Sequence, residues 1–197
     1  MTKAFTSLPE GYQELLRLDL QKDKKKFLLV NGLGILIFVL LAVPMHFYVS
    51  FFSLFSMEEG LLDYSLRFLV LAVGMVVYLV LHELVHGVAM KLCGTKKVKY
   101  GFTGVYAFAG SSDYYDKKSY LFIALAPVVL WGVVIGVVNA FVPEQWFWTV
   151  YMIQLMNLSG AAGDLYVTVK FLGLPKDILV TDCGVAMTVY SQSYGKG

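Results

Sequence analysis

The chain alternates between long apolar stretches and short polar connections. Four of the apolar stretches exceed the roughly 20 residues that an α-helix needs to cross the hydrocarbon core of a bilayer. They lie at about residues 27–54, 68–92, 119–142 and 145–172. The pattern predicts an all-α polytopic membrane protein with four transmembrane helices, and the four spans together form a core over residues 27–172.

The two ends of the chain are more polar than this core. Residues 1–26 are charged and lack the apolar run of a cleavable signal peptide, so we expect a cytoplasmic N-terminal segment. Within it, the leucines and charges of residues 8–20 predict an interfacial helix. Residues 173–197 are expected to form a cytoplasmic tail. Apolar residues alternate over residues 178–190, which predicts a strand that pairs with an earlier hairpin.

That earlier hairpin is expected between spans two and three. Aromatic residues recur at even positions over residues 98–109, and Gly101 and Gly104 stand between them. Alternation with glycine punctuation predicts a β-hairpin-like insertion associated with the membrane. Its exposed strand edge could bind an unwound peptide by strand addition. A plain connecting hairpin explains the pattern equally well.

Composition and charge support a membrane location. The chain is 58% hydrophobic and 15% charged, with a mean hydropathy of +0.67, which excludes an ordinary soluble domain. Except for Arg67, the lysines and arginines fall on one side of the four-span arrangement, which places both termini in the cytoplasm. The net charge of +2 therefore reflects topology, and no nucleic-acid partner is expected. Cys93 and Cys183 both lie on the cytoplasmic side, where a disulfide is not expected.

The segment His82-Glu83-Leu84-Val85-His86 carries the most specific chemistry. Two of the chain's three histidines lie here, directly after an uncharged apolar run. On a helix, His82 and His86 share one face and can bind the same Zn²⁺ ion. Glu83 flanks that face, close enough to activate a zinc-bound water. Ionisable side chains in a membrane span are costly, so their presence indicates function.

A catalytic zinc needs a third protein ligand. At 1.5 Å per residue, His82 and His86 lie about 14 and 8 Å from Lys91 along the helix axis, and Asp164 lies about 9 Å from Lys170. The three side chains are therefore expected at a similar depth, and Asp164 is the predicted third ligand.

The surroundings of Asp164 also favour this assignment. Asn157 and Gly160 fall on the same helical face as Asp164. Small residues at 160–163 would let this helix approach span two closely. Asp177 and Asp182 are weaker candidates, because both lie beyond the predicted span.

These motifs resemble those of a known group of enzymes. The sequence His-Glu-Leu-Val-His-Gly at 82–87 and the later Asp164 resemble the site-2 protease class of intramembrane zinc metalloproteases. The chain is most similar to the small bacterial family of putative zincin peptidases related to that class. It departs from the site-2 pattern in two places: Gly160 stands where that pattern has proline, and Gly163 precedes Asp164 instead of following it.

The resemblance implies a role for each matching residue. His82, His86 and Asp164 would bind zinc, and Glu83 would act as general base. Asn157 would orient the substrate backbone. The implied protein is an integral protein of the bacterial plasma membrane whose substrate is a membrane protein or peptide.

The predicted function is that of a zinc-dependent intramembrane endopeptidase, which hydrolyses peptide bonds of membrane-embedded or membrane-proximal substrates. The alternative is a non-catalytic, zinc-containing membrane protein that binds or sequesters partner proteins. A metal transporter is disfavoured, because the sequence shows one acidic-histidine cluster and no relay across the bilayer.

Overall fold

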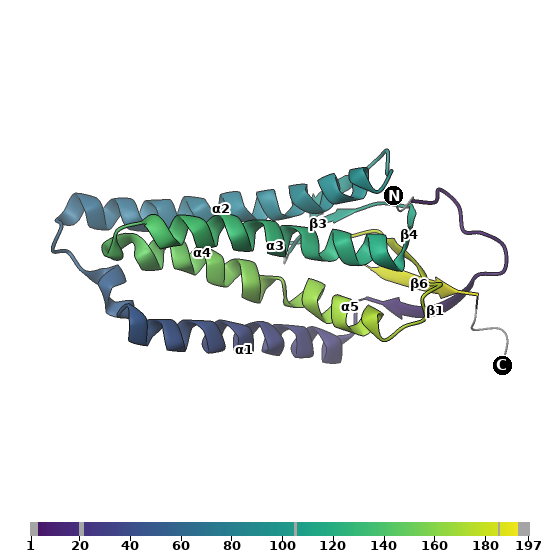
Figure 1. Cartoon of the computed structure of the whole chain (residues 1–197), viewed down its shortest axis with the longest axis horizontal. Helices are drawn as coiled ribbons and strands as arrows, with labels where there is room; N and C mark the ends of the chain where they lie inside the picture. The colour runs from purple at the N-terminus through teal and green to yellow at the C-terminus, as the bar shows by residue number, and fades with distance from the viewer. Residues whose placement is uncertain (1–3, 20–21, 105, 185, 193–197) are drawn as a thin grey trace. The chain divides into compact units, whose positions relative to one another are not determined.

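The computed structural model describes residues 4–19, 22–104, 106–184 and 186–192, so Lys196 and the end of the predicted tail lie outside the described residues. Helices make up most of this part of the chain (Figure 1). The α-helices are α1 (Lys24–Tyr48), α2 (Leu61–Leu92), α3 (Lys117–Phe141), α4 (Phe147–Gly160) and α5 (Ala162–Leu172). Two short 3₁₀ helices, η1 (Phe51–Phe55) and η2 (Glu144–Trp146), lie in the connections.

Among the described residues, three helices are long and apolar enough to cross a membrane, namely α1, α2 and α3. The fourth predicted span is divided instead between α4, of 14 residues, and α5, of 11 residues. Ala161 separates them with φ −81° and ψ 16°, which is outside the helical region. The break falls within the small residues at 160–163. Neither helix alone has the roughly 20 residues of a span.

The strands form two separate antiparallel sheets. A four-stranded sheet has the order β1-β6-β5-β4. Its strands are β1 (Gln13–Leu18), β4 (Tyr114–Asp116), β5 (Leu179–Asp182) and β6 (Met187–Ser191). The second sheet is a hairpin of β2 (Lys99–Phe102) and β3 (Ala107–Gly110), in the range where the sequence predicts one.

The structure corrects two predictions about the ends of the chain. The interfacial helix predicted over residues 8–20 is wrong, because Gln13–Leu18 form strand β1. Leu16 and Leu18 alternate along this strand, and β6 supplies its hydrogen-bonding partner in the registers Leu16↔Val189 and Leu18↔Met187. The strand predicted in the tail exists as β5 and β6, but these pair with β4 and β1 rather than with the first hairpin.

The chain divides into two compact units. Unit 1 comprises Met1–Leu29, Glu83–Pro127 and Asp164–Gly197. Its core packs the four-stranded sheet against the C-terminal part of α2, the N-terminal part of α3 and α5, through fully buried residues such as Tyr115, Phe171 and Val180. Cys93 belongs to this core, and both cysteines are free thiols.

Unit 2 comprises Val30–His82 and Val128–Gly163. An aromatic cluster that includes Trp148 and Tyr151 forms its core. Arg67 is also buried here, with 1% of its surface exposed. Its guanidinium pairs with Asp63 at 2.8 Å and donates hydrogen bonds to several backbone carbonyls, those of Ser53, Leu54, Ser56 and Gln145. These contacts offset the cost of burying the charge of Arg67.

Candidate metal centre

Helix α2 presents both predicted histidine ligands on one face. His82 and His86 are one helical turn apart, and each is only 9% exposed. The boundary between the two units falls between His82 and Glu83, but α2 is one continuous helix through this point. Glu83 is half-buried and follows His82 by about 100° around the helix axis. The helix itself therefore sets the spacing of the three motif side chains.

The third predicted ligand comes from the first turn of α5. The Nε2 atom of His86 lies 3.7 Å from Oδ1 of Asp164, whose side chain is 28% exposed. His82, His86 and Asp164 each offer one ligand atom, and these atoms all lie within 4.8 Å of one another. The break at Ala161 starts a new helix just before Asp164, so the small residues at 160–163 help to set the position of the carboxylate.

A backbone carbonyl orients the ring of His86. Nδ1 of His86 lies 2.9 Å from the carbonyl oxygen of Ile123 on α3. Because a carbonyl can only accept a hydrogen bond, Nδ1 carries the proton and donates it. The lone pair of Nε2 is then directed to the side of the ring where Asp164 lies.

A side-chain network orients the ring of His82. Nδ1 of His82 lies 2.8 Å from the hydroxyl of Tyr78, one turn earlier on α2. Tyr78 donates its hydroxyl hydrogen to Oδ1 of Asn157 over 2.9 Å, and Nδ2 of Asn157 donates to the carbonyl oxygen of Val128 over 3.1 Å. Asn157 is fully buried. All four residues belong to unit 2.

The donor set fits zinc. Two imidazole nitrogens and one carboxylate oxygen are the protein ligands of many catalytic zinc sites, which keep a further position for water or substrate. Two ligands on a tetrahedral zinc, at bond lengths of about 2.0–2.1 Å, lie roughly 3.3 Å apart. The 3.7 Å between His86 and Asp164 is close to that value. Hydrogen bonds from the far nitrogen of each histidine are also typical of metal ligands.

Comparison with known proteins agrees with this chemistry. Residues 75–179 match the family described as "Putative zincin peptidase". The match covers more than half of the chain. The chain belongs to this family. The matched residues include the whole motif in α2, Asn157 and Asp164, so the family region contains every candidate site residue predicted from the sequence.

One curated relative is an "Uncharacterized 24.7 kDa protein in gap 5'region" from Pyrococcus woesei. It is 29% identical over 127 residues, which cover 62% of this chain and 54% of the relative. The chain therefore spans about half the length of this relative. No solved structure matches the chain.

The sequence predicted the grouping of the motif histidines with Asp164, whereas the contact of Tyr78 with His82 was not predicted. The structure brings His82, His86 and Asp164 together, as expected. Asn157 lies in the neighbouring hydrogen-bond network and not among the ligand atoms. The spacing of Tyr78 could have indicated its contact with His82, because Tyr78 lies four residues earlier and therefore on the same face of α2.

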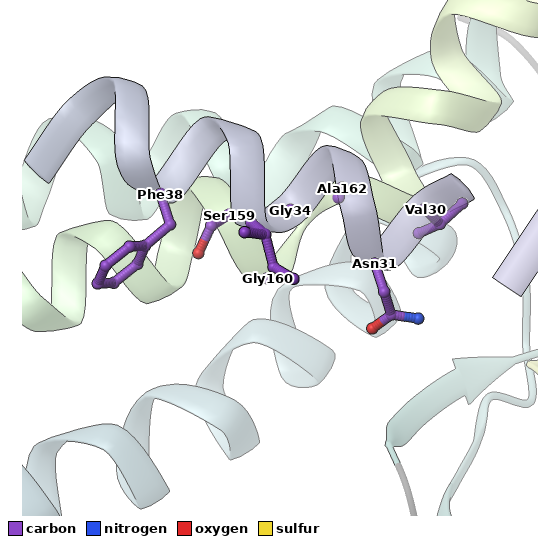
Figure 2. A pocket seen from close by; sticks show the side chains of 8 residues that line it. Val30, Asn31, Gly34, Phe38, Ser159, Gly160 and Ala162 are labelled. Atoms are coloured by element: carbon purple, nitrogen blue, oxygen red, sulfur yellow. The ribbon is translucent and has the colours of Figure 1, made fainter. Parts of the chain in front are cut away.

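A groove in unit 2 lies apart from the ligand set. It encloses about 330 Å³ between α1 and the region where α4 ends, and Figure 2 shows its lining from close by. The lining residues are Val30, Asn31, Gly34, Ile35, Phe38, Ser159, Gly160 and Ala162. A Cβ atom at Gly34 would lie 2.9 Å from the carbonyl oxygen of Ser159, so glycine permits this close approach. The groove contains none of the candidate metal ligands.

A second acidic group lies in unit 1, at the end of β5. Tyr120 donates a 2.5 Å hydrogen bond to Oδ2 of Asp182, and the backbone N–H of Gly184 donates to Oδ1 over 2.8 Å. Burial raises the pKa of Asp182 above its ordinary value, although these two hydrogen bonds oppose the shift. Among the described residues, Asp182 is not part of the candidate metal group.

Proposed function

We propose that this protein is a zinc-dependent endopeptidase that cleaves membrane-embedded or membrane-proximal polypeptides. The observation that carries the proposal is the ligand group His82, His86 and Asp164 beside Glu83, on a helix long and apolar enough to span a membrane. Membership of the zincin family supports zinc as the metal and peptide hydrolysis as the reaction. The three long apolar helices support the membrane setting.

Each residue has a defined task in this reaction. His82, His86 and Asp164 would hold the metal, which would supply Lewis acidity at this site. Glu83 accepts the proton of the attacking water and returns it to the leaving amine. A C–O bond forms and the C–N bond breaks, so water is divided between the two products and Glu83 ends in its starting state.

The proposed substrate class follows from the position of the motif in α2. The amides of a membrane helix are paired internally, so a substrate helix must unwind before its carbonyl can be attacked. We therefore propose substrates whose spans contain helix-breaking residues near the cleavage point. In the proposed orientation, both termini and the lysine-rich end of α2 face the cytoplasm, as the basic residues indicate.

The β2–β3 hairpin is a candidate element for holding the unwound substrate. Within the described residues, β2 pairs only with β3. The hairpin reaches α2 beside the second histidine: a Cβ atom at Gly87 would lie 1.9 Å from the hydroxyl oxygen of Tyr100. An extended peptide can pair with an open strand edge through its main chain. A photo-crosslinker at Phe102, which is 70% exposed, should capture a bound substrate, whereas one at Leu62 should not.

The direct test replaces the proposed base. Glu83→Gln keeps the size of the side chain and removes its ability to accept a proton, so we expect cleavage to fall by at least about 100-fold while zinc stays bound. Glu59→Gln, at an exposed position in the α1–α2 connection, is the matched control. The assay uses single-span model substrates that carry a Gly-Pro pair in the span, reconstituted with the enzyme.

Two results would redirect the proposal. Equal cleavage by the parent and Glu83→Gln would remove Glu83 from the chemistry. If the parent binds zinc and captures these substrates but leaves them intact, the chain is a non-catalytic zinc protein that sequesters membrane partners.

A further inference from the structure

The hydrogen-bond network around His82 has a direction that its chemistry fixes. The carbonyl of Val128 can only accept, so Asn157 must present its Nδ2 donor there. Oδ1 of Asn157 then faces Tyr78 and accepts the single hydroxyl hydrogen of that residue. With its hydrogen used in this way, the Tyr78 oxygen accepts the hydrogen bond from Nδ1 of His82. The proton of neutral His82 therefore resides on Nδ1.

We propose that Tyr78 and Asn157 are positioning residues, which hold His82 as the tautomer that offers the Nε2 lone pair to the metal. This inference rests on the proposed zinc centre. It gives Asn157 a role different from substrate orientation. The reason is geometric: Asn157 has no exposed surface, and both polar atoms of its amide are engaged within unit 2.

Burial makes the arrangement specific. Tyr78 is 6% exposed and His82 is 9% exposed. A buried donor without an acceptor is costly, so the proton on Nδ1 is favoured only while the Tyr78 oxygen is present to accept it. Hydrogen bonds to the far nitrogen of a metal-binding histidine fix its tautomer and ring orientation, and their loss typically weakens metal binding by about 10- to 100-fold.

The third histidine provides an internal reference. Nδ1 of His46 lies 2.9 Å from the backbone nitrogen of Phe51. A backbone N–H can only donate, so Nδ1 of His46 accepts and its proton resides on Nε2. The structure therefore assigns His46 the tautomer opposite to that of His82 and His86.

The experiment combines ¹⁵N NMR of the imidazole nitrogens with zinc titration against a competing chelator. The spectra are recorded on the zinc-free protein in detergent, at a pH where the ring of His82 is neutral, and His82→Asn assigns the signals. In the parent, we expect a protonated Nδ1 and an unprotonated Nε2 for His82, with the opposite pattern for His46.

Two variants test the two links of the network. In Tyr78→Phe the Nδ1 proton has lost its acceptor, so the His82 signals should shift toward a mixture of tautomers and zinc affinity should fall about 10- to 100-fold. In Asn157→Leu, a substitution of similar size, the Tyr78 hydroxyl is released to donate to Nδ1. The proton of His82 then moves to Nε2, and zinc affinity falls although Asn157 lies outside the ligand set.

The matched control is Tyr151→Phe. Tyr151 is also a buried tyrosine of unit 2, and its hydroxyl donates to the carbonyl of Leu41 over 3.1 Å. Its removal costs a comparable hydrogen bond and should leave both the His82 signals and zinc affinity unchanged. The double variant Tyr78→Phe, Asn157→Leu should have about the zinc affinity of whichever single variant binds zinc less tightly. The two substitutions act on one network, so their effects on affinity should not add.

The outcomes separate this inference from the proposed function. If Tyr78→Phe keeps the parent's zinc affinity and His82 spectrum, the positioning role is wrong, whereas the zinc peptidase proposal stands. If the parent binds zinc and the two variants show these shifts, but the parent cleaves no substrate, the positioning role holds and the peptidase proposal fails. A parent that binds no zinc overturns both.

Discussion

The Nε2 atom of His86 lies 3.7 Å from Oδ1 of Asp164, although α3 and α4 separate the two residues along the chain. Both residues belong to unit 1. The pair depends on two local features, the rigid turn of α2 that carries His86 and the helix break at Ala161 that starts α5. The candidate metal centre thus combines a continuous helix, α2, with a helix break in another apolar stretch.

The buried arginine of unit 2 should be a major contributor to stability. Arg67→Met removes a cation that pairs with Asp63 and donates to the backbone carbonyls of Leu54 in η1 and Gln145 in η2. Removal of one partner from a buried ion pair typically costs about 3–5 kcal/mol, so we expect a loss in the free energy of unfolding of about 3 kcal/mol or more. Denaturant unfolding in mixed micelles measures it.

The exposed pair of Lys22 and Asp19 is the control for this substitution. Its atoms are 3.9 Å apart and the lysine side chain is 85% exposed, so Lys22→Met should leave unfolding unchanged. If Arg67→Met and the parent have the same free energy of unfolding, the contacts of Arg67 with Asp63 and the backbone carbonyls do not stabilise the fold.

The raised pKa of Asp182 predicts a pH dependence of stability. Because burial penalises the ionised carboxylate, the stability that protonated Asp182 contributes is present at acid pH. It is lost as the pH rises from the ordinary value of 3.8 through the raised pKa of the folded state. Asp182→Asn cannot ionise, so the thermal midpoint of the variant should fall less than that of the parent between about pH 4 and pH 7.

The comparison uses the difference between parent and variant on chelator-treated protein, so that titration of other groups cancels. Parallel midpoint curves across this pH range would show that Asp182 has the same pKa in the folded and unfolded chain.

The end of β3 should not tolerate a side chain at Gly110. A Cβ atom there would lie 2.4 Å from the carbonyl carbon of Cys183 and 2.5 Å from the backbone nitrogen of Gly184, and backbone atoms cannot move aside cheaply. Gly110→Ala should therefore lower stability by about 1–3 kcal/mol. Gly136→Ala is the matched control, because a Cβ atom at Gly136 of α3 meets nothing within 4 Å. Thermal unfolding of both variants tests whether Gly110 packs this closely against the backbone of Cys183 and Gly184. Equal midpoints for Gly110→Ala and Gly136→Ala would contradict it.

The sequence could predict those features that depend on local pattern. Apolar length predicted α1, α2 and α3, and the spacing of His82 and His86 predicted a shared helical face. The depth estimate also expected Asp164 level with the two histidines, and its carboxylate lies within 4.8 Å of their ligand atoms. These predictions succeed because helix geometry converts residue number directly into position.

The remaining features depend on tertiary contacts that no local pattern reveals. Gln13–Leu18 form a strand because they pair with β6, and β6 lies near the other end of the sequence. The orientation of His86 depends on the backbone carbonyl of Ile123, which has no side-chain signature. The small residues of the fourth apolar stretch indicate that its helix could break, but the sequence does not show that the break falls at Ala161.

The central claim is that three side chains bind one zinc ion. Its most direct measurement is the zinc content of detergent-purified protein, prepared without chelators, for the parent, Asp164→Ala and Asp177→Ala. Asp177 lies in the same unit, where its carboxylate accepts hydrogen bonds from Ser191 and Gln192, and it is outside the ligand group. We predict about one zinc per chain in the parent and in Asp177→Ala, and a sharp loss in Asp164→Ala. A parent without zinc, or equal zinc in all three proteins, would contradict the proposed centre.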